Sequence, residues 1–277
     1  MGKNSKRLTF AIRNVLLIVY SLVSIYPMIW TVINSFKERW QFSVDNMGLP
    51  NRLAFENYAN AIAASHMDVY VINSIIASAI SMTLILTVSF VTGYLLSRYT
   101  FKANPVIYGM FLLGMLIPVH SLLIPLFIQF SRLGLIDNLF MLGVAYCATG
   151  LPVSVFLIAG YVKTIPRDME EAAYIDGANL FQVMFRIIFP MTKPVISTVV
   201  IMAFLGAWNE FPFALILLSK QNLKTIPIGM ANFSGEFSVE YTQLLAASIM
   251  ATLPVLIVYA IFNKQIVAGM TAGAVKG

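Results

Sequence analysis

Four carboxylates gather in one short stretch of the chain, although only 12 of its 277 residues are acidic. Asp168, Glu170, Glu171 and Asp176 fall within nine positions, between two long apolar stretches. The chemistry open to them depends on what they face, which could be a metal ion, a reacting group or the charged surface of a partner protein. The other residues that could carry chemistry narrow this choice.

The sequence gives no support for catalysis or metal binding. Neither His66 nor His120 has a second ligand residue at the spacing of a zinc site. The patterns H-E-x-x-H, G-x-S-x-G and G-x-x-x-x-G-K-[ST] are all missing. A lone Cys147 forms no disulfide framework and suits a packing role. We therefore expect a non-catalytic chain without metal or cofactor, which must take any energy from a separate subunit.

The elements that hold these residues are membrane spans. The chain is 59% hydrophobic and 11% charged, with a mean hydropathy of +0.81, whereas a soluble domain has about 25% charged residues. A helix needs about 20 apolar residues to cross a bilayer core. Six stretches are long enough, at 14–34, 71–97, 105–130, 138–162, 195–218 and 243–262.

Basic residues precede the first stretch, but no small-residue cleavage site follows, so we expect an uncleaved span. Pro118 and Pro125 predict kinks in the third span. The prediction is one all-α integral membrane domain over residues 1–277.

The distribution of Lys and Arg predicts the orientation of these spans. With the amino terminus inside, the inner segments hold 12 Lys and Arg and the outer segments hold 6. This asymmetry matches the positive-inside rule, so both termini and the loop 163–194 are expected on the cytoplasmic side. The net charge of +6 is then a signal of topology and does not favour nucleic-acid binding.

The loop 163–194 has the spacing of two short helices. Pro166 suits a first helical turn, Gly177 can end that helix in the left-handed conformation, and Asn179 suits the cap of the next. Pro190 is expected to limit the second helix. The apolar face of that helix consists of Leu180, Val183, Met184, Ile187 and Ile188. Each helix reaches only about 15–18 Å, which is too short to cross the membrane.

Two interpretations of this loop stay open on spacing alone. Ala172 and Ala173 are small, so another surface can approach the first helix closely beside its carboxylates, which fits docking into a cleft of a partner. The alternative is an amphipathic hairpin lying at the lipid interface. The acidic residues argue against the second interpretation, since helices on anionic lipid favour Lys and Arg.

Glu210 is an ionisable residue within the predicted span 195–218. Carboxylates inside a membrane usually face a cavity or a neighbouring helix, so we assign Glu210, with Trp208 and Asn209, to a translocation path. Pro212 is expected to loosen the helix there. The alternative is that Glu210 reaches outer-surface water or makes a contact between helices.

Several motifs resemble those of a known family. Glu171-Ala172-Ala173, then Gly177, Ile187 and Phe189-Pro190, follow the pattern of the "EAA" loop of binding-protein-dependent ABC importer permeases. The family pattern usually has Leu where this chain has Phe189. Four further segments resemble the maltose-permease-like second permease subunit of carbohydrate-uptake systems: GYLLSRYTF (93–101), RLGLIDN (132–138), GAWNEF (206–211) and GMTAGAVKG (269–277).

The resemblance implies a fold and a set of contacts. It implies the type I ABC importer permease fold, in which the EAA loop forms coupling helices seated in a cleft of a cytoplasmic ATPase. The loop residues that it implies are Glu170, Glu171, Ala172, Ala173, Asp176, Gly177, Ile187 and Pro190. Of these, Glu170, Glu171 and Asp176 would face the ATPase. The tail with Gly273 and Lys276 would also contact the ATPase, and the outer loop 219–241 would meet the loaded binding protein.

We therefore expect one permease subunit of an ATP-driven importer of a sugar or sugar-like solute, in the cytoplasmic membrane of a prokaryote. Its partners would be a second homologous permease, two ATP-binding cassette ATPase subunits and an extracytoplasmic solute-binding protein. An ion-coupled secondary transporter or channel would need charged groups within its spans, where only Glu210 is available, and no inverted repeat is evident. A non-transporting scaffold would explain the docking loop but neither Glu210 nor the resemblance.

The charge asymmetry makes a prediction about labelling. Single cysteines placed at Lys220 and at Lys102, in a background with Cys147 replaced, should react with an impermeant thiol reagent from outside the cell and only after lysis, respectively. The measurement is labelling in intact and lysed cells. The opposite pattern would invert the topology.

Overall fold

The computed structural model describes residues 3–233 and 240–274, and every regular element in these ranges is a helix. The chain divides into two compact units, one formed by residues 1–67 and 230–253, the other by residues 68–229 and 254–277. The all-α membrane fold expected from composition is confirmed. The single permease domain over residues 1–277 stays a prediction.

The first unit contains α1 (Lys3–Ser35), α2 (Arg39–Val44), α3 (Glu56–Ser65) and the first part of α14 (Tyr241–Ala274). Buried polar groups close the loop between α1 and α3. Lys37 is fully buried, and its Nζ donates to the carbonyl of Asp45 at 2.8 Å. Asn57 donates to the carbonyls of Ser35 and Lys37, each at 2.8 Å. These bonds give the loop a defined structure of its own.

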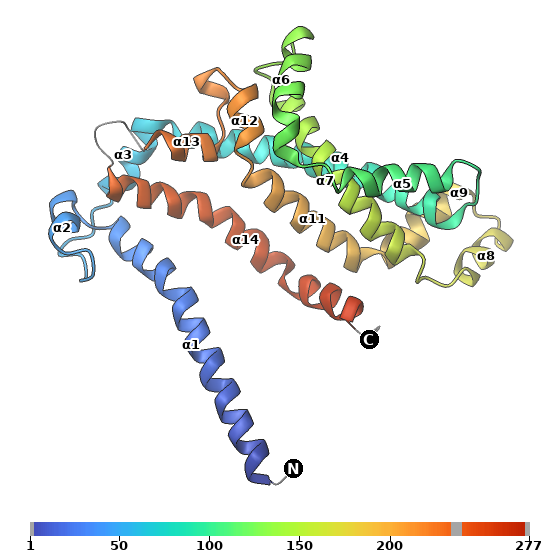
Figure 1. The fold of residues 1–277 in the computed structure, drawn as a ribbon, viewed down its shortest axis with the longest axis horizontal. Coiled ribbons are helices and arrows are strands. Elements are labelled where there is room, and N and C mark those ends of the chain that lie inside the picture. Colours follow the sequence, from blue (N-terminus) through green and yellow to red (C-terminus); the bar gives the residue numbers. More distant parts are fainter. Residues whose placement is uncertain (1–2, 234–239, 275–277) are drawn as a thin grey trace. The chain divides into compact units, whose positions relative to one another are not determined.

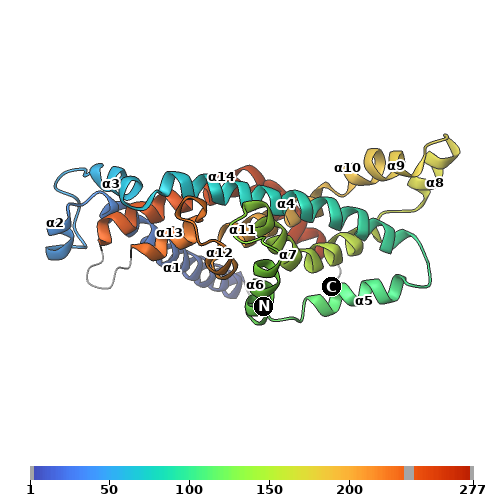
Figure 2. The ribbon, with the colours of Figure 1, turned by 90° about the horizontal axis from the view of Figure 1, so that it is seen from above.

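The second unit holds most of the remaining helices. They are α4 (Met67–Arg98), α5 (Asn104–Gly114), η1 (Val119–Leu122), α6 (Leu123–Arg132), α7 (Leu139–Val162), α8 (Asp168–Ile175), α9 (Leu180–Gln182), the π-helix η2 (Val183–Ile188), α10 (Phe189–Met191), α11 (Lys193–Trp208), α12 (Pro212–Leu217) and η3 (Gln221–Leu223). Next along the chain, α13 (Ile226–Asn232) contributes residues to both units. Within the second unit, α4, α7 and α11 lie alongside one another, and α8 lies at one end of them (Figures 1 and 2).

Four of the six predicted spans are single long helices. By length and composition they can cross a membrane over Phe10–Ser35, Met67–Arg98, Leu139–Val162 and Tyr241–Phe262. The predicted spans 105–130 and 195–218, however, are not continuous. The first consists of α5 followed by η1 and α6, bent by 97° at the break. The second is α11, which ends at Trp208, followed after three residues by α12.

Only one of the two prolines predicted to kink the third span does so. Pro118 has an extended backbone (φ −64°, ψ 118°) and caps η1 at the break. Pro125 lies in the first turn of α6, where backbone N–H groups have no partner within the helix, so the missing donor costs nothing. The predicted loosening at Pro212 is also observed, because α12 begins at this residue.

Glycine allows α4 and α7 to pack closely. A Cβ on Gly143 of α7 would lie 2.6 Å from Ile80 Cγ2 and 2.8 Å from Ile80 Cβ on α4. A Cβ on Gly93 of α4 would lie 2.9 Å from Ile158 Cγ2 and 3.1 Å from the backbone nitrogen of Ala159 on α7. Small residues at such positions let membrane helices approach and gain van der Waals contact.

This packing predicts that two glycines of α7 respond differently to substitution. Gly143→Ala should cost about 1–3 kcal/mol by overpacking and lower the melting temperature of the purified protein in detergent. Gly160→Ala is the matched control, because no atom lies within 4 Å of its Cβ position and Ala favours the helix. Equal melting temperatures for the two variants would contradict the observed packing.

Candidate functional site

The loop between α7 and α11 forms the predicted hairpin of two short helices. α8 begins at Asp168 and ends at Ile175, and Gly177 follows with φ of +84°, in the left-handed region. The second helix starts with a capping box. Asn179 Oδ1 accepts from the backbone N–H of Gln182 at 3.0 Å, and Gln182 Oε1 accepts from the backbone N–H of Asn179 at 2.8 Å. The predicted geometry of both Gly177 and Asn179 is confirmed.

The apolar face predicted for the second helix is also confirmed. Val183, Met184 and Ile188 are buried, and Leu180 and Ile187 are half-buried, packed in a core that the hairpin shares with α4, α7 and α11.

The second helix ends at Met191, one residue after Pro190, as expected for a proline that limits the helix. The wider turns of the π-helix η2 precede Pro190, so the ring and the missing N–H fall where the α-helical ladder is already interrupted. Phe189, which departs from the family pattern, packs edge-on against Phe90 of α4 with ring centroids 5.0 Å apart.

Glu170 faces the interior of the chain and is only 7% exposed. Its Oε1 lies 2.5 Å from Nε of Arg98, and its Oε2 accepts a hydrogen bond from the hydroxyl of Tyr94 at 2.9 Å. Both partners are on the last turns of α4. The expectation that Glu170 faces a partner ATPase is therefore wrong, because both carboxylate oxygens contact residues of its own chain. Removing one partner of a buried ion pair costs about 3–5 kcal/mol, since the other charge is left uncompensated.

Ala173, one turn after Glu170, is buried on the same face of α8. Its small side chain lets α8 approach the core of its own chain. The sequence predicted close approach of another surface at both alanines, but only one of them is free for it. Ala173 faces inward, while Ala172 is exposed.

The opposite face of the hairpin is open. Glu171, Asp176 and Gly177 are exposed. Large apolar side chains stand beside them, with Ile175 at 86% and Phe181 at 68% exposure on the two sides of the turn. The hairpin therefore presents carboxylates and apolar groups together, on helices anchored from behind by Glu170.

The end of α4 makes further contacts around this anchor. Arg98 Nη2 donates to the carbonyl of Ile165, in the segment that leads from α7 to α8, at 2.8 Å. The hydroxyls of Tyr99 and Tyr174 are hydrogen-bonded at 3.2 Å. This bond to Tyr174 is the main reason that the pKa of Tyr99 is raised above its ordinary value.

Glu210 lies at the break between α11 and α12. Its Oε1 accepts from the backbone N–H of Phe213 at 2.7 Å, and its Oε2 accepts from that of Ala214 at 3.1 Å. The carboxylate thus satisfies the first free N–H groups of α12, as a capping residue does. Neither of the two roles considered from sequence included this one. The signal was an acidic residue two positions before a proline, Glu210 before Pro212, which is typical of a helix start.

The other two residues assigned to the translocation path differ in exposure. Trp208 is buried and stacks on Phe204 with ring centroids 5.4 Å apart. Asn209 is exposed and donates to the carbonyl of Leu205 in its own helix at 2.9 Å. They share the break with Glu210, but their side chains do not converge on one surface.

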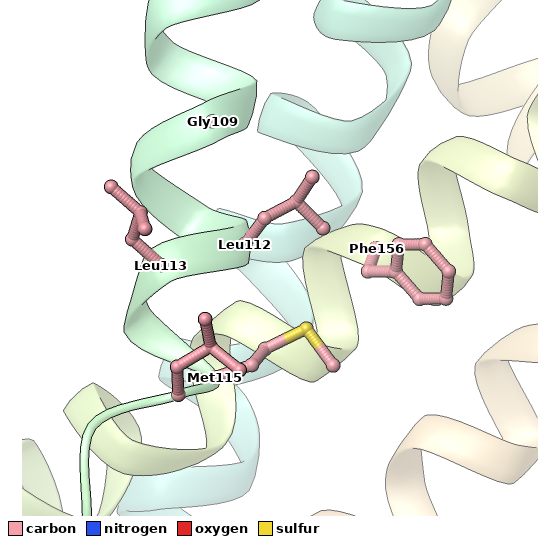
Figure 3. A pocket seen from close by; sticks show the side chains of 6 residues that line it. Gly109, Leu112, Leu113, Met115 and Phe156 are labelled. Atoms are coloured by element: carbon pink, nitrogen blue, oxygen red, sulfur yellow. The ribbon is translucent and has the colours of Figure 1, made fainter.

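An apolar hollow lies between α5 and α7 in the second unit (Figure 3). Its lining consists of Gly109, Leu112, Leu113, Met115, Leu116 and Phe156. No polar side chain lines it, so sugar hydroxyls would lose their hydrogen bonds to water without replacement. This hollow is not suited to a sugar.

The predicted tail contact lies at the end of the chain. In the predicted tail contact, Gly273 belongs to α14 and Lys276 lies outside the described residues. Over residues 3–233 and 240–274, no group of three or more His, Cys, Asp or Glu could hold a metal ion.

Residues 89–271 match the family described as the inner membrane component of binding-protein-dependent transport systems. The chain belongs to this family. The matched region contains the hairpin, the end of α4 that anchors it and both helix breaks. Together with the long apolar helices, the match makes the chain a multi-pass membrane component of a binding-protein-dependent transport system.

Individual relatives match over nearly the whole chain. The diacetylchitobiose uptake system permease protein NgcG of Streptomyces coelicolor is 32% identical, over 99% of this chain and 91% of its own. The trehalose/maltose transport system permease protein MalG of Thermococcus litoralis is 33% identical, over 94% of each. A crystal structure of a bacterial ABC transporter involved in import of the acidic polysaccharide alginate contains a chain of the same fold. Its TM-score is 0.84 at 22% identity, covering 96% of this chain and 99% of that one.

The turn of the hairpin gives a prediction with a matched control. Gly177→Val should cost about 1–3 kcal/mol, because a β-branched residue is strained at positive φ, although no atom lies within 4 Å of its Cβ position. Solute uptake should fall at least tenfold while membrane abundance stays near that of the unchanged protein. Gly134→Val places the same strain at φ +67°, again with open space around the Cβ, in the loop between α6 and α7.

Measuring uptake and abundance for both variants separates the hairpin from general strain. Equal uptake in the Gly177 and Gly134 variants would show that the geometry of the hairpin has no special part in transport.

Proposed function

We propose that this chain is one permease subunit of an ATP-driven importer for a sugar or sugar-like solute. Membership of the binding-protein-dependent family supports the transport role. The carbohydrate assignment is supported by the relatives, whose names give diacetylchitobiose and trehalose/maltose as their solutes. Within this proposal the chain binds no nucleotide, and a partner subunit hydrolyses ATP.

The observation that carries the coupling role is the open face of the hairpin. α8 has 8 residues, which is about 12 Å of helix, so it cannot cross a bilayer. Ile175 and Phe181 are exposed beside Glu171 and Asp176. A mixed surface of apolar and acidic groups on an anchored hairpin fits a cleft of a partner protein that supplies basic residues. We assign this face, with Ala172 and Gly177, to contact with the ATPase.

The inward residues of the hairpin have a supporting role in this proposal. Glu170 and Ala173 hold α8 against its own chain, and half-buried Ile187 packs the second helix on the same core. Pro190 lies in α10, next to the bend of 78° that leads into α11. These residues set the direction in which the exposed face points.

The two ends of α4 support placing the hairpin and the segment with Asn222 and Lys224 on opposite sides of the membrane. The hairpin is tied to its last turns by Arg98, and the segment with Asn222 and Lys224 is tied to its first turns by Asn73. About 37 Å of helix lies between Asn73 and Arg98, which is more than the thickness of a bilayer core. We place the hairpin and both termini on the cytoplasmic side and the loop 219–241 outside, against the solute-binding protein.

The remaining partners complete the importer. A second homologous permease would share the translocation path, and two ATP-binding cassette subunits would hold the coupling helices of both permeases. We assign the break at Trp208, Asn209 and Glu210 to the path, because irregular backbone at membrane depth occurs where it is buried in protein or lines a cavity. The tail with Gly273 and Lys276 is assigned to the ATPase.

The assembly gives a direct test of this function. The purified chain should hydrolyse no ATP, whereas vesicles with both permeases and two ATPase subunits should hydrolyse ATP faster when sugar-loaded binding protein is added. The measurements are phosphate release and uptake of labelled sugar. Sugar uptake driven by an ion gradient in vesicles that contain this chain alone would refute the importer.

A further inference from the structure

The carboxyl end of α4 is fixed to the coupling helix α8 by a buried cluster. Arg98 and Glu170 form an ion pair whose side chains are only 6% and 9% exposed, and Tyr94 donates to the second oxygen of Glu170. The bond between Tyr99 and Tyr174 ties the same two elements nearby. Separating a buried ion pair leaves a charge uncompensated, at a cost of about 3–5 kcal/mol, so this contact resists opening. We call Arg98, Glu170 and Tyr94 the inner joint.

The amino end of α4 is hydrogen-bonded to a different segment, residues 221–226. Asn73 Nδ2 donates to the carbonyls of Asn222 and Lys224, at 3.0 and 2.9 Å. Ser74 Oγ accepts from the backbone N–H of Ile226 at 2.9 Å, and the hydroxyl of Tyr70 is hydrogen-bonded to Gln221. These three α4 side chains are 0–6% exposed. We call Tyr70, Asn73 and Ser74 the outer joint.

A single uninterrupted helix connects the two joints. α4 runs from Met67 to Arg98 without a proline, and Gly93 is used for close packing on α7. About 37 Å of helix separates Asn73 from Arg98, at about 1.5 Å per residue. The predicted third and fifth spans, in contrast, are each interrupted within their length. Of these three spans, α4 is the one in which a single continuous helix contacts both α8 and the segment 221–226.

We propose that α4 moves as a rigid body that passes displacement between the outer segment 221–226 and the coupling helix α8, with Arg98, Glu170 and Tyr94 as positioning residues. This inference rests on the proposed function, in which α8 contacts the ATPase and the loop 219–241 contacts the binding protein. Contact of loaded binding protein with the outer segment then changes the position of α8 through the inner joint. Two distinct sites and one element that both of them bias are what such coupling requires.

The test compares four variants in the complete importer. Glu170→Gln removes one charge of the inner joint at nearly equal volume, and Arg98→Gln removes the other. Asn73→Ala removes two of the bonds of the outer joint, and the exchange Arg98→Glu with Glu170→Arg reverses the pair. Asp68→Asn is the control, because Asp68 is an exposed carboxylate on the same helix. For each variant the measurements are membrane abundance, ATPase retained on purification, basal ATP hydrolysis, its stimulation by loaded binding protein, and sugar moved per ATP.

We expect loss of stimulation without loss of assembly. Glu170→Gln, Arg98→Gln and Asn73→Ala should each reduce the stimulation at least fivefold and lower the sugar moved per ATP, with ATPase retention near that of the unchanged protein. Combining Asn73→Ala with Glu170→Gln should add little to either single loss, because both interrupt one connection. The reversed pair should recover part of the stimulation, and Asp68→Asn should keep all of it.

Three results would overturn the inference. Full stimulation in both Glu170→Gln and Arg98→Gln would show that the inner joint transmits nothing. Loss of abundance and retention, with normal stimulation in the complexes that do form, would show a purely structural ion pair. Losses that multiply when the two joints are combined would show two independent effects. An unchanged importer without ATP-dependent sugar uptake would instead refute the proposed function, and this inference with it.

Discussion

The hydrocarbon core of a bilayer offers no water to backbone N–H and C=O groups, so each helix that ends inside it needs a protein group to complete its hydrogen bonds. This constraint explains the position of Glu210 in the second unit. Glu210 receives the first N–H groups of α12. Beyond the other end of α12, Asp137 Oδ1 accepts from the backbone N–H of Ser219 at 2.6 Å and of Lys220 at 3.0 Å. Glu210 thus completes the start of α12, and Asp137 fixes the exposed residues that follow its end.

The same reasoning separates features that the sequence could predict from those that it could not. Helix length and apolar content predicted the four long spans, and local chemistry predicted the hairpin turn. Gly177 and the Asn179–Gln182 capping box act over a few residues, so the adjacent residue types are enough to predict their geometry. The break of the third span was predicted at Pro118, whereas Pro125 could not be separated from it until the start of α6 was known.

Contacts between distant segments could not be predicted in this way. Glu170 and Glu171 are neighbours with the same charge, and the direction of each depends on which side of α8 faces the core. The ion pair with Arg98 turns Glu170 toward the core. Arg98 lies far from Glu170 in sequence, and from sequence alone it counted only as a cytoplasmic basic residue. The buried Ala173, one turn beyond Glu170, was the local hint that this face is turned inward. Similarly, Glu210 was interpreted by its depth in a continuous span, and the break in that span changed its role.

The length of α11 has a consequence for the lipid around this subunit. Its 16 residues extend about 24 Å, compared with about 30 Å for the hydrocarbon core of a typical bilayer. Met202 and Leu205 are exposed on this helix, while Val199 and Ala203 are buried. The exposed side of α11 therefore presents an apolar wall shorter than the thickness of the hydrocarbon core. Where lipid reaches this wall, the remaining thickness of the core falls to the break after Trp208 and to α12, so thickness mismatch acts on the segment that links the hairpin to α12.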